Sequence, residues 1–115
     1  MKNIYLAGRM TGVPDYNYSE FIRTAEMLRA ITGAQVVHTA NAPRRDTLEH
    51  RHYMEWGRVW LNLCDAVAVL PDWEKSAGTR QEIEMATAMK LPIFYLPNQT
   101  KMLCEWAVEG QDAIL

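Results

Sequence analysis

Short, mainly apolar runs alternate along this chain with longer segments in which apolar residues recur at the spacing of a helix. The runs have the length of strands and lie at residues 4–7, 34–38, 66–70 and 93–96. An unbroken run such as 66–70 is typical of a parallel strand that is covered on both faces. The intervening segments predict helices after residue 17 and at about 49–63, 79–90 and 101–108.

Strands that alternate with helices of this length predict right-handed βαβ units. We therefore expect an α/β fold: a small doubly wound, Rossmann-like or flavodoxin-like parallel sheet of four to five strands with flanking helices. No segment has the composition of a linker and nothing repeats, so residues 1–115 are expected to form a single domain.

Capping residues and apolar stripes set the expected limits of the helices. Asn17 or Ser19 can cap the first helix, and Gly33 fits its end. The side chains expected to face the sheet are Phe21, Ile22, Ala25, Leu28 and Ile31 in the first helix, and Ile83, Ala86 and Met89 in the third. Residues 39–48 are polar and contain Pro43, Arg44 and Arg45, which favours a solvated loop.

Composition limits the partners of such a domain. The 115 residues are 49% hydrophobic and 23% charged, with a formal net charge of −2. This is ordinary for a globular protein and argues against binding to a nucleic-acid polymer. No run approaches the roughly 20 apolar residues of a transmembrane helix, and the apolar stretch at the N-terminus is too short for a signal peptide. We therefore expect a cytoplasmic protein without a membrane partner, in which Cys64 and Cys104 are buried thiols.

The stretch from residue 65 to residue 88 is expected to carry the site. It reads as a buried strand, a polar turn at 71–78 and a helix. In open α/β sheets, ligands bind beyond the carboxyl ends of the strands, where loops lead into helix N-termini. This places Ser76, Gly78 and Glu82 around one site. The free N–H groups of such a helix start, together with Arg80, suit a phosphate.

Three segments of the chain carry a resemblance to a known family. They read Ile-Tyr-Leu-Ala-Gly-Arg-Met-Thr-Gly at 4–12, Trp-Leu-Asn-Leu-Cys-Asp-Ala-Val-Ala-Val at 60–69 and Ser-Ala-Gly-Thr-Arg-Gln-Glu at 76–82. In this order they resemble the nucleoside 2-deoxyribosyltransferase superfamily, which includes 2′-deoxynucleoside 5′-phosphate N-hydrolases. The third segment is similar to its Ser-x-Gly-x-x-x-Glu motif, and the Met-Thr-Gly loop is similar to that of small phage and bacterial members.

The resemblance implies chemistry at an N-glycosidic bond. In enzymes of the superfamily, the Glu at the position of Glu82 is the nucleophile on the anomeric carbon, and the Ser at the position of Ser76 helps to hold a 5′-phosphate. The chemistry also follows from the residues, since breaking this bond develops positive charge at C1′ that a close carboxylate stabilises or captures. Such a reaction needs neither a metal nor a cofactor. The expected ligand is a (deoxy)nucleoside or its 5′-monophosphate.

Two loops supply the remaining expected contacts. In the first loop, Gly8 lets the backbone approach the sugar, Met10 belongs to the Met-Thr-Gly stretch, and Arg9 adds a cation where related proteins often have Pro. Tyr16 can stack on a base. Trp73, in the loop after the third strand, can line a base pocket.

Gly57 is a departure from the family pattern. The family's catalytic Asp stands three residues before the position that matches Trp60, and this chain has Gly57 there. A nucleophile without this partner has nothing to orient it or the sugar, and no spacing argument supports Glu55 or Asp46 as a replacement. The alternative function is therefore a nucleotide-binding protein that sequesters its ligand without turnover.

Structural roles compete with each functional one. Thr79 to Glu82 has the form of a capping box, in which Glu82 reaches back to the N–H group of Thr79. No Cys or His cluster has the spacing of a metal site, so no metal is expected.

The tryptophans are explained by the core or by contacts between subunits. A four-stranded sheet is thin, so we expect a second copy to cover the apolar side chains near the end of the chain, which are Met102, Leu103 and Trp106. This points to a homodimer or larger homo-oligomer. The tryptophan content also leaves open a third function, that of a purely structural dimer module.

Overall fold

The computed structural model describes residues 2–38 and 50–112, and of residues 50–53 and 110–112 it describes the backbone alone. The elements follow one another as β1 (Asn3–Ala7), η1 (Pro14–Asn17), α1 (Tyr18–Thr32), β2 (Gln35–His38), α2 (His50–Leu63), β3 (Ala66–Val69), η3 (Trp73–Lys75), α3 (Ala77–Ala88), β4 (Ile93–Tyr95) and α4 (Thr100–Asp112). Strands and helices alternate as predicted, and the expected loop at 39–48 lies outside the described residues.

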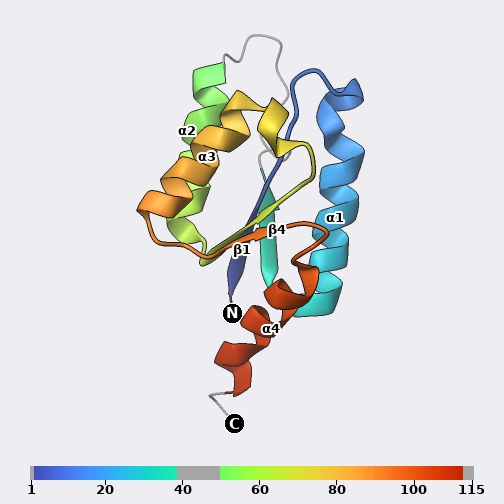
Figure 1. The fold of residues 1–115 in the computed structure, drawn as a ribbon, viewed down its shortest axis with the longest axis vertical. Coiled ribbons are helices and arrows are strands. Elements are labelled where there is room, and N and C mark those ends of the chain that lie inside the picture. Colours follow the sequence, from blue (N-terminus) through green and yellow to red (C-terminus); the bar gives the residue numbers. More distant parts are fainter. Residues whose placement is uncertain (1, 39–49, 113–115) are drawn as a thin grey trace.

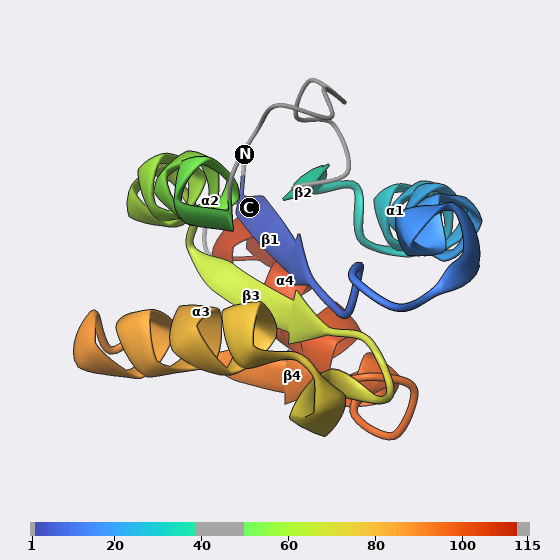
Figure 2. The ribbon, with the colours of Figure 1, turned by 90° about the horizontal axis from the view of Figure 1, so that it is seen from above.

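The four described strands form one parallel sheet in the order β2-β1-β3-β4. Two apolar layers enclose it (Figures 1 and 2): α1 and α4 cover one face, and α2 and α3 cover the other. Successive residues of β1 show the alternation, because Ile4 and Leu6 pack toward α1 while Tyr5 and Ala7 pack toward α2 and α3. The predicted doubly wound α/β fold is confirmed.

The chain reverses its winding direction between β1 and β3. From β1 it passes through α1 to β2 on one side, and from β3 it passes through α3 to β4 on the other. Ala7 and Val69 are paired at the carboxyl ends of these two strands, and the N–H group of Leu70 donates to the carbonyl oxygen of Ala7. Ligands of open α/β sheets bind at such a switch point, so the fold itself directs attention to this edge.

The structure corrects the expected start of α3. Ser76, not Thr79, is the N-cap: its backbone is extended and its Oγ accepts a hydrogen bond from the N–H group of Thr79 at 3.2 Å. The helix therefore begins at Ala77, and Thr79 is its third residue rather than its cap. Glu82 lies in the second turn, too far along the helix to complete a capping box with Thr79.

The structure also corrects details of α1 and of the apolar stripes. Asn17 stands at the N-cap position, but its Nδ2 donates to the carbonyl oxygen of Arg9 at 3.0 Å instead of capping the helix. Gly33 ends α1 in the left-handed conformation, as predicted. Ile31 and Met89, expected to face the sheet, are exposed. In the last turns of α1 the buried positions are Leu28 and Thr32, which turns Ile31 outward, and Met89 is the C-cap of α3, beyond its last turn.

The last helix is longer than predicted and packs against the first residues of the chain. Leu103 is buried, and Trp106 packs on Phe94 with ring centroids 5.9 Å apart. The Lys2 ammonium lies 4.1 Å from the centre of the Trp106 ring. Trp106 is thus accommodated within one copy of the chain, whereas Met102 is exposed. Within the described residues, no helix combines the length and apolar character needed to cross a lipid bilayer.

Candidate functional site

The loops after β1 and β3 touch each other at the switch point. A β-carbon placed on Gly8 would lie 2.6 Å from Cδ1 of Leu70, and Leu70 is buried. Only a residue without a side chain allows this approach. Gly8 therefore packs one loop against the other, and its expected contact with a sugar remains a prediction.

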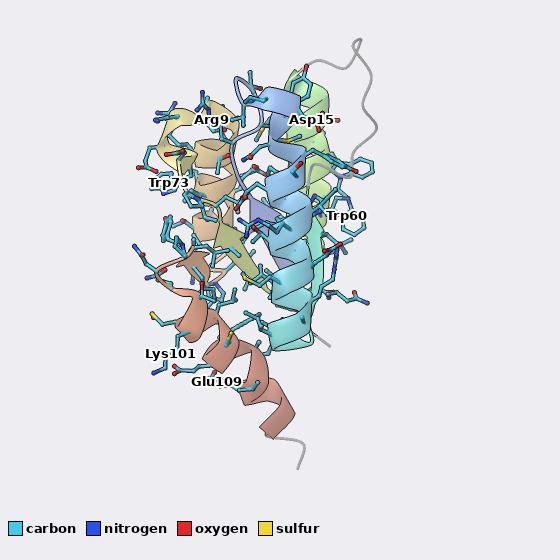
Figure 3. The ribbon with its side chains drawn as sticks, turned by 90° about the vertical axis from the view of Figure 1, so that its right-hand side faces the viewer. Arg9, Asp15, Trp60, Trp73, Lys101 and Glu109 are labelled. Carbon is cyan, nitrogen blue, oxygen red and sulfur yellow. The ribbon has the colours of Figure 1, made fainter. Side chains whose placement is uncertain are left out.

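Arg9 folds back over its own loop. A β-carbon on Gly12 would lie 2.9 Å from Nη2 of Arg9, and Gly12 has a φ of +85°, a backbone conformation that suits glycine. Nε of Arg9 is buried without a hydrogen-bond partner in the described structure. Figure 3 shows Arg9, Asp15 and Trp73 toward the end of the molecule that lies opposite Lys101 and Glu109. The loop thus brings a cation to the edge predicted to hold the ligand.

Backbone strain is concentrated at this edge. Among the described residues, five that are not glycine have a positive φ, and four of them lie in the two loops: Asp15, Tyr16, Asn17 and Asp72. Such conformations cost of order 1–3 kcal/mol each and often mark functional sites. Tyr16 is 56% exposed, so its ring is available for the stacking predicted from the sequence.

The N-terminus of α3 supplies hydrogen-bond donors at the same edge. Oγ of Ser76 accepts from both the N–H group and the hydroxyl of Thr79, which leaves its own hydroxyl hydrogen to be donated elsewhere. The first N–H groups of the helix, including that of Gly78, have no intrahelical partner. Arg80 is exposed just behind them. Ser76, Gly78 and Arg80 thus lie together at the start of α3, and their contact with a ligand stays a prediction.

We expect Ser76→Ala to lower the free energy of unfolding by about 1 kcal/mol, because it removes the N-cap of α3. Chemical denaturation followed by circular dichroism measures this loss. Ser19→Ala, an exposed serine in the first turn of α1, is the matched control and should change stability by less. Equal effects of the two substitutions would contradict the capping role.

Trp73 lies beside the N-terminus of α3. It lies in η3, is half-buried, and its ring centroid is 5.4 Å from that of Tyr95 on β4. The ring is therefore held by the layer between the sheet and α3. Its remaining exposed part stands in the loop predicted to contact a base.

Glu82 and Tyr5 form a buried polar pair below this edge. The Tyr5 hydroxyl donates a hydrogen bond to Oε2 of Glu82, and the two residues are 0% and 5% exposed. Burial raises the pKa of Glu82 from its ordinary value of 4.5 to about 7, and the hydrogen bond from Tyr5 opposes part of this rise. The N-terminus of α3 does not offset this rise, because the carboxyl group lies in the second turn of the helix and faces the sheet.

Gly57 of α2 lies directly against this pair. A β-carbon placed on Gly57 would be 2.8 Å from Oε2 of Glu82 and 2.8 Å from the Tyr5 hydroxyl. Gly57 is thus next to Glu82 in space, although the two residues are 25 positions apart in the sequence. Sequence reasoning missed Tyr5. The available signal was a single hydroxyl within a buried aliphatic strand, since such a group needs a partner.

A groove of about 660 Å³ runs along the outer side of the same helix pair. It is lined by Met54, Glu55, Arg58, Gln81, Glu84, Met85 and Ala88. Glu82 does not line it, because Glu82 points from α3 toward the sheet. The carboxyl group and this groove therefore lie on opposite sides of the contact between α2 and α3.

His38 is a second buried titratable group, at the end of β2. It packs on Phe21 with ring centroids 5.4 Å apart, and it is 3% exposed. Its Nδ1 has no hydrogen-bond partner in the part of the chain that the structure describes. Burial, with a smaller contribution from the positive charge of Arg29, lowers the pKa of His38 from 6.5 to about 4. The imidazole is therefore uncharged at neutral pH.

Residues 2–95 match the model of a protein family described as "Domain of unknown function (DUF4406)". The chain belongs to the DUF4406 family. The matched residues include β1, both loops of the switch point, Gly57 and Glu82, whereas α4 lies beyond them. A comparison with curated proteins found no match. The described site is therefore part of the DUF4406 domain itself.

A solved structure shares the fold of this DUF4406 protein. It is the crystal structure of a conserved protein from Enterococcus faecalis V583, with 21% sequence identity and a TM-score of 0.64. The match covers 83% of this chain and 62% of that protein, so the DUF4406 chain corresponds to less than two thirds of its length. At this identity the likeness extends to the α/β architecture.

Proposed function

We propose that this protein cleaves or transfers at the N-glycosidic bond of a (deoxy)nucleoside or a nucleoside 5′-monophosphate, with Glu82 as the nucleophile. The observation that carries the proposal is the Tyr5–Glu82 pair below the β1/β3 switch point: a single carboxyl group that a tyrosine hydroxyl orients. The resemblance of three segments to the nucleoside 2-deoxyribosyltransferase superfamily supports the same chemistry.

The reaction follows from a single carboxylate. One oxygen of Glu82 forms a bond to C1′ while the bond from C1′ to the base nitrogen breaks, and the electron pair of that bond leaves with the base, which takes up a proton. Water then attacks C1′, its hydroxyl group stays on the sugar, its proton is released, and the Glu82 carboxylate is regenerated. If a second base attacks C1′ instead of water, the sugar is transferred.

The loops of the switch point carry groups that suit the 5′-phosphate and the base of such a substrate. The donors of Ser76 and of the Gly78 N–H group, with the guanidinium groups of Arg9 and Arg80, match a 5′-phosphate. On this proposal Trp73 and Tyr16 contact the base, while Gly8 and Met10 pass beside the sugar. The proposal also includes action in the cytoplasm, a homodimer or larger homo-oligomer, and no nucleic-acid polymer, metal or cofactor as partner.

Incubation with a panel of nucleosides and nucleoside 5′-monophosphates, followed by chromatography, tests the reaction. We expect free base and the matching sugar or sugar phosphate to appear with at least one member. The panel also separates hydrolysis from transfer when a second free base is added. Recovery of every compound intact would contradict the proposal.

A binding protein without turnover is the second candidate function, and one observation favours it. Glu82 is only 5% exposed, and Gly57 supplies no second carboxylate beside it. Such a protein would retain a nucleotide and return it intact when heated. A thermal shift with a nucleotide that is later recovered unchanged would favour this function, whereas base and sugar phosphate would favour the enzyme.

The pH dependence of base release follows from the raised pKa of Glu82. The nucleophile is the ionised form, so kcat/KM should rise with pH up to about pH 7 and then level off. In Tyr5→Phe the hydrogen bond that lowers this pKa is gone, and the rise should move to higher pH. A profile of wild type and variant over pH 5 to about 9 measures both. A wild-type profile that is flat across neutral pH would contradict the role of Glu82.

A further inference from the structure

Gly57 lies at a position where glycine lowers the stability of a helix. It lies within α2, where glycine is less favourable than alanine by up to about 1 kcal/mol. Its space is not empty, because the position of a β-carbon is filled by two polar atoms, Oε2 of Glu82 and the hydroxyl oxygen of Tyr5. The helix backbone of α2 is therefore in direct contact with the buried pair.

The two polar atoms have little freedom to move away. The ring of Tyr5 is 0% exposed and packs in the layer with Leu61, Val67 and Ala86, which come from α2, β3 and α3. Glu82 is 5% exposed and lies against Tyr5 of β1 and Gly57 of α2. Any side chain at position 57 must consequently displace the Tyr5 hydroxyl, the Glu82 carboxyl group, or both.

We infer that Gly57 is a positioning residue: by omitting a side chain it lets the Tyr5 hydroxyl reach Glu82, so that a tyrosine on β1 orients this carboxyl group in place of a second carboxylate on α2. The role in orientation rests on the proposed function. The contact of the three residues does not. Under this inference Gly57 is a required part of the site and not a lost catalytic group.

The two interpretations of Gly57 predict opposite results for Gly57→Asp. If Gly57 marks the loss of a catalytic carboxylate, Gly57→Asp restores a carboxylate beside Glu82 and base release increases. If the glycine positions the pair, the aspartate displaces the Tyr5 hydroxyl and brings a second negative charge to the buried carboxyl group. We then expect base release to fall at least tenfold below that of the wild type. An increase in base release would overturn the inference.

A double-variant cycle tests the contact without requiring any reaction. Gly57→Ala should lower the midpoint of chemical denaturation, although helix propensity alone predicts an increase. In a Tyr5→Phe background, where the hydroxyl oxygen is gone, the same substitution should lower the midpoint much less or raise it. Equal shifts in the two backgrounds would overturn the inference. The Tyr5→Phe background keeps the test open even if Gly57→Ala alone does not fold.

The titration of Glu82 separates positioning from simple packing. Carbon-13 NMR of the Glu82 carboxyl group in Gly57→Ala should show a titration midpoint above that of the wild type, because the hydrogen bond from Tyr5 is weakened. Val59→Ala, an exposed residue on the same helix, is the control and should leave the midpoint unchanged. An unchanged midpoint in Gly57→Ala would overturn the inference. If the wild type releases no base at all, the proposed function fails, while this titration and the double-variant cycle still test the contact.

Discussion

Glu82→Gln is expected to abolish base release, by at least about 10³-fold in kcat/KM, and to leave ligand binding nearly unchanged. An amide is not a nucleophile toward C1′, whereas its carbonyl oxygen can still accept the hydrogen bond from Tyr5. Because glutamine has nearly the same size as glutamate, the layer between the sheet and α3 should remain packed. Chromatography of released base and a thermal shift with the same nucleotide measure the two effects.

Glu84→Gln is the matched control for this substitution. Glu84 lies two residues further along α3, is exposed, and lines the outer groove instead of facing the sheet. We expect its rate of base release to equal that of the wild type. Base release by Glu82→Gln at an undiminished rate would remove Glu82 from the reaction, and loss of ligand binding in that variant would show a disrupted fold.

The strands were predictable because a buried strand is a continuous run of apolar residues, which can be recognised from the sequence alone. The run at residues 66–70 is apolar throughout, since β3 is covered on both faces, and the observed strand falls within it. The parallel, right-handed winding also followed from local signals, because short strands joined by helices have few chiral ways to wind. The strand order β2-β1-β3-β4 was not predicted and comes from the structure. Boundaries were less predictable: Ser76 and Thr79 are both good caps, and the choice between them depends on how the loop from β3 enters the helix.

The environment of Glu82 could not be predicted in the same way. Its burial depends on contacts with Tyr5 and with Gly57, which lie 77 and 25 residues away in the sequence. Helix periodicity shows that position 82 lies close to the inward face shared by Ile83 and Ala86, but it does not show what stands opposite. The role of Tyr5 could not be predicted for the same reason. A tyrosine in a strand is expected to pack in the core, and only the structure shows which group accepts the hydrogen bond from its hydroxyl.

Two of the buried titratable groups in the described structure, Glu82 and His38, act on stability in opposite directions. Glu82 has a pKa raised from 4.5 to about 7, and His38 has a pKa lowered from 6.5 to about 4. Between pH 4.5 and 7 the folded protein holds a proton on Glu82 that the unfolded chain releases, so stability falls as pH rises. Between pH 4 and 6.5 the unfolded chain holds a proton on His38 that the folded protein excludes, so stability rises with pH.

We therefore expect the two contributions to cancel in the wild type between about pH 4.5 and 6.5 and to separate in variants. One pKa unit corresponds to about 1.4 kcal/mol, so each group changes the free energy of unfolding by about 3 kcal/mol across its range. Relative to wild type, Glu82→Gln should gain stability as pH rises through this range, and His38→Gln should lose it. Urea denaturation at half-unit pH intervals measures both differences.

Comparison of each variant with the wild type at the same pH cancels the titration of all other carboxyl groups. Glu84→Gln again serves as the control, because it makes the same substitution two residues further along α3 at an exposed side chain. A difference between Glu82→Gln and wild type that does not change with pH would mean that Glu82 titrates as it does in water. The carboxyl group would then lie open to solvent, and the enclosed Tyr5–Glu82 pair from which the reaction was argued would not exist in solution.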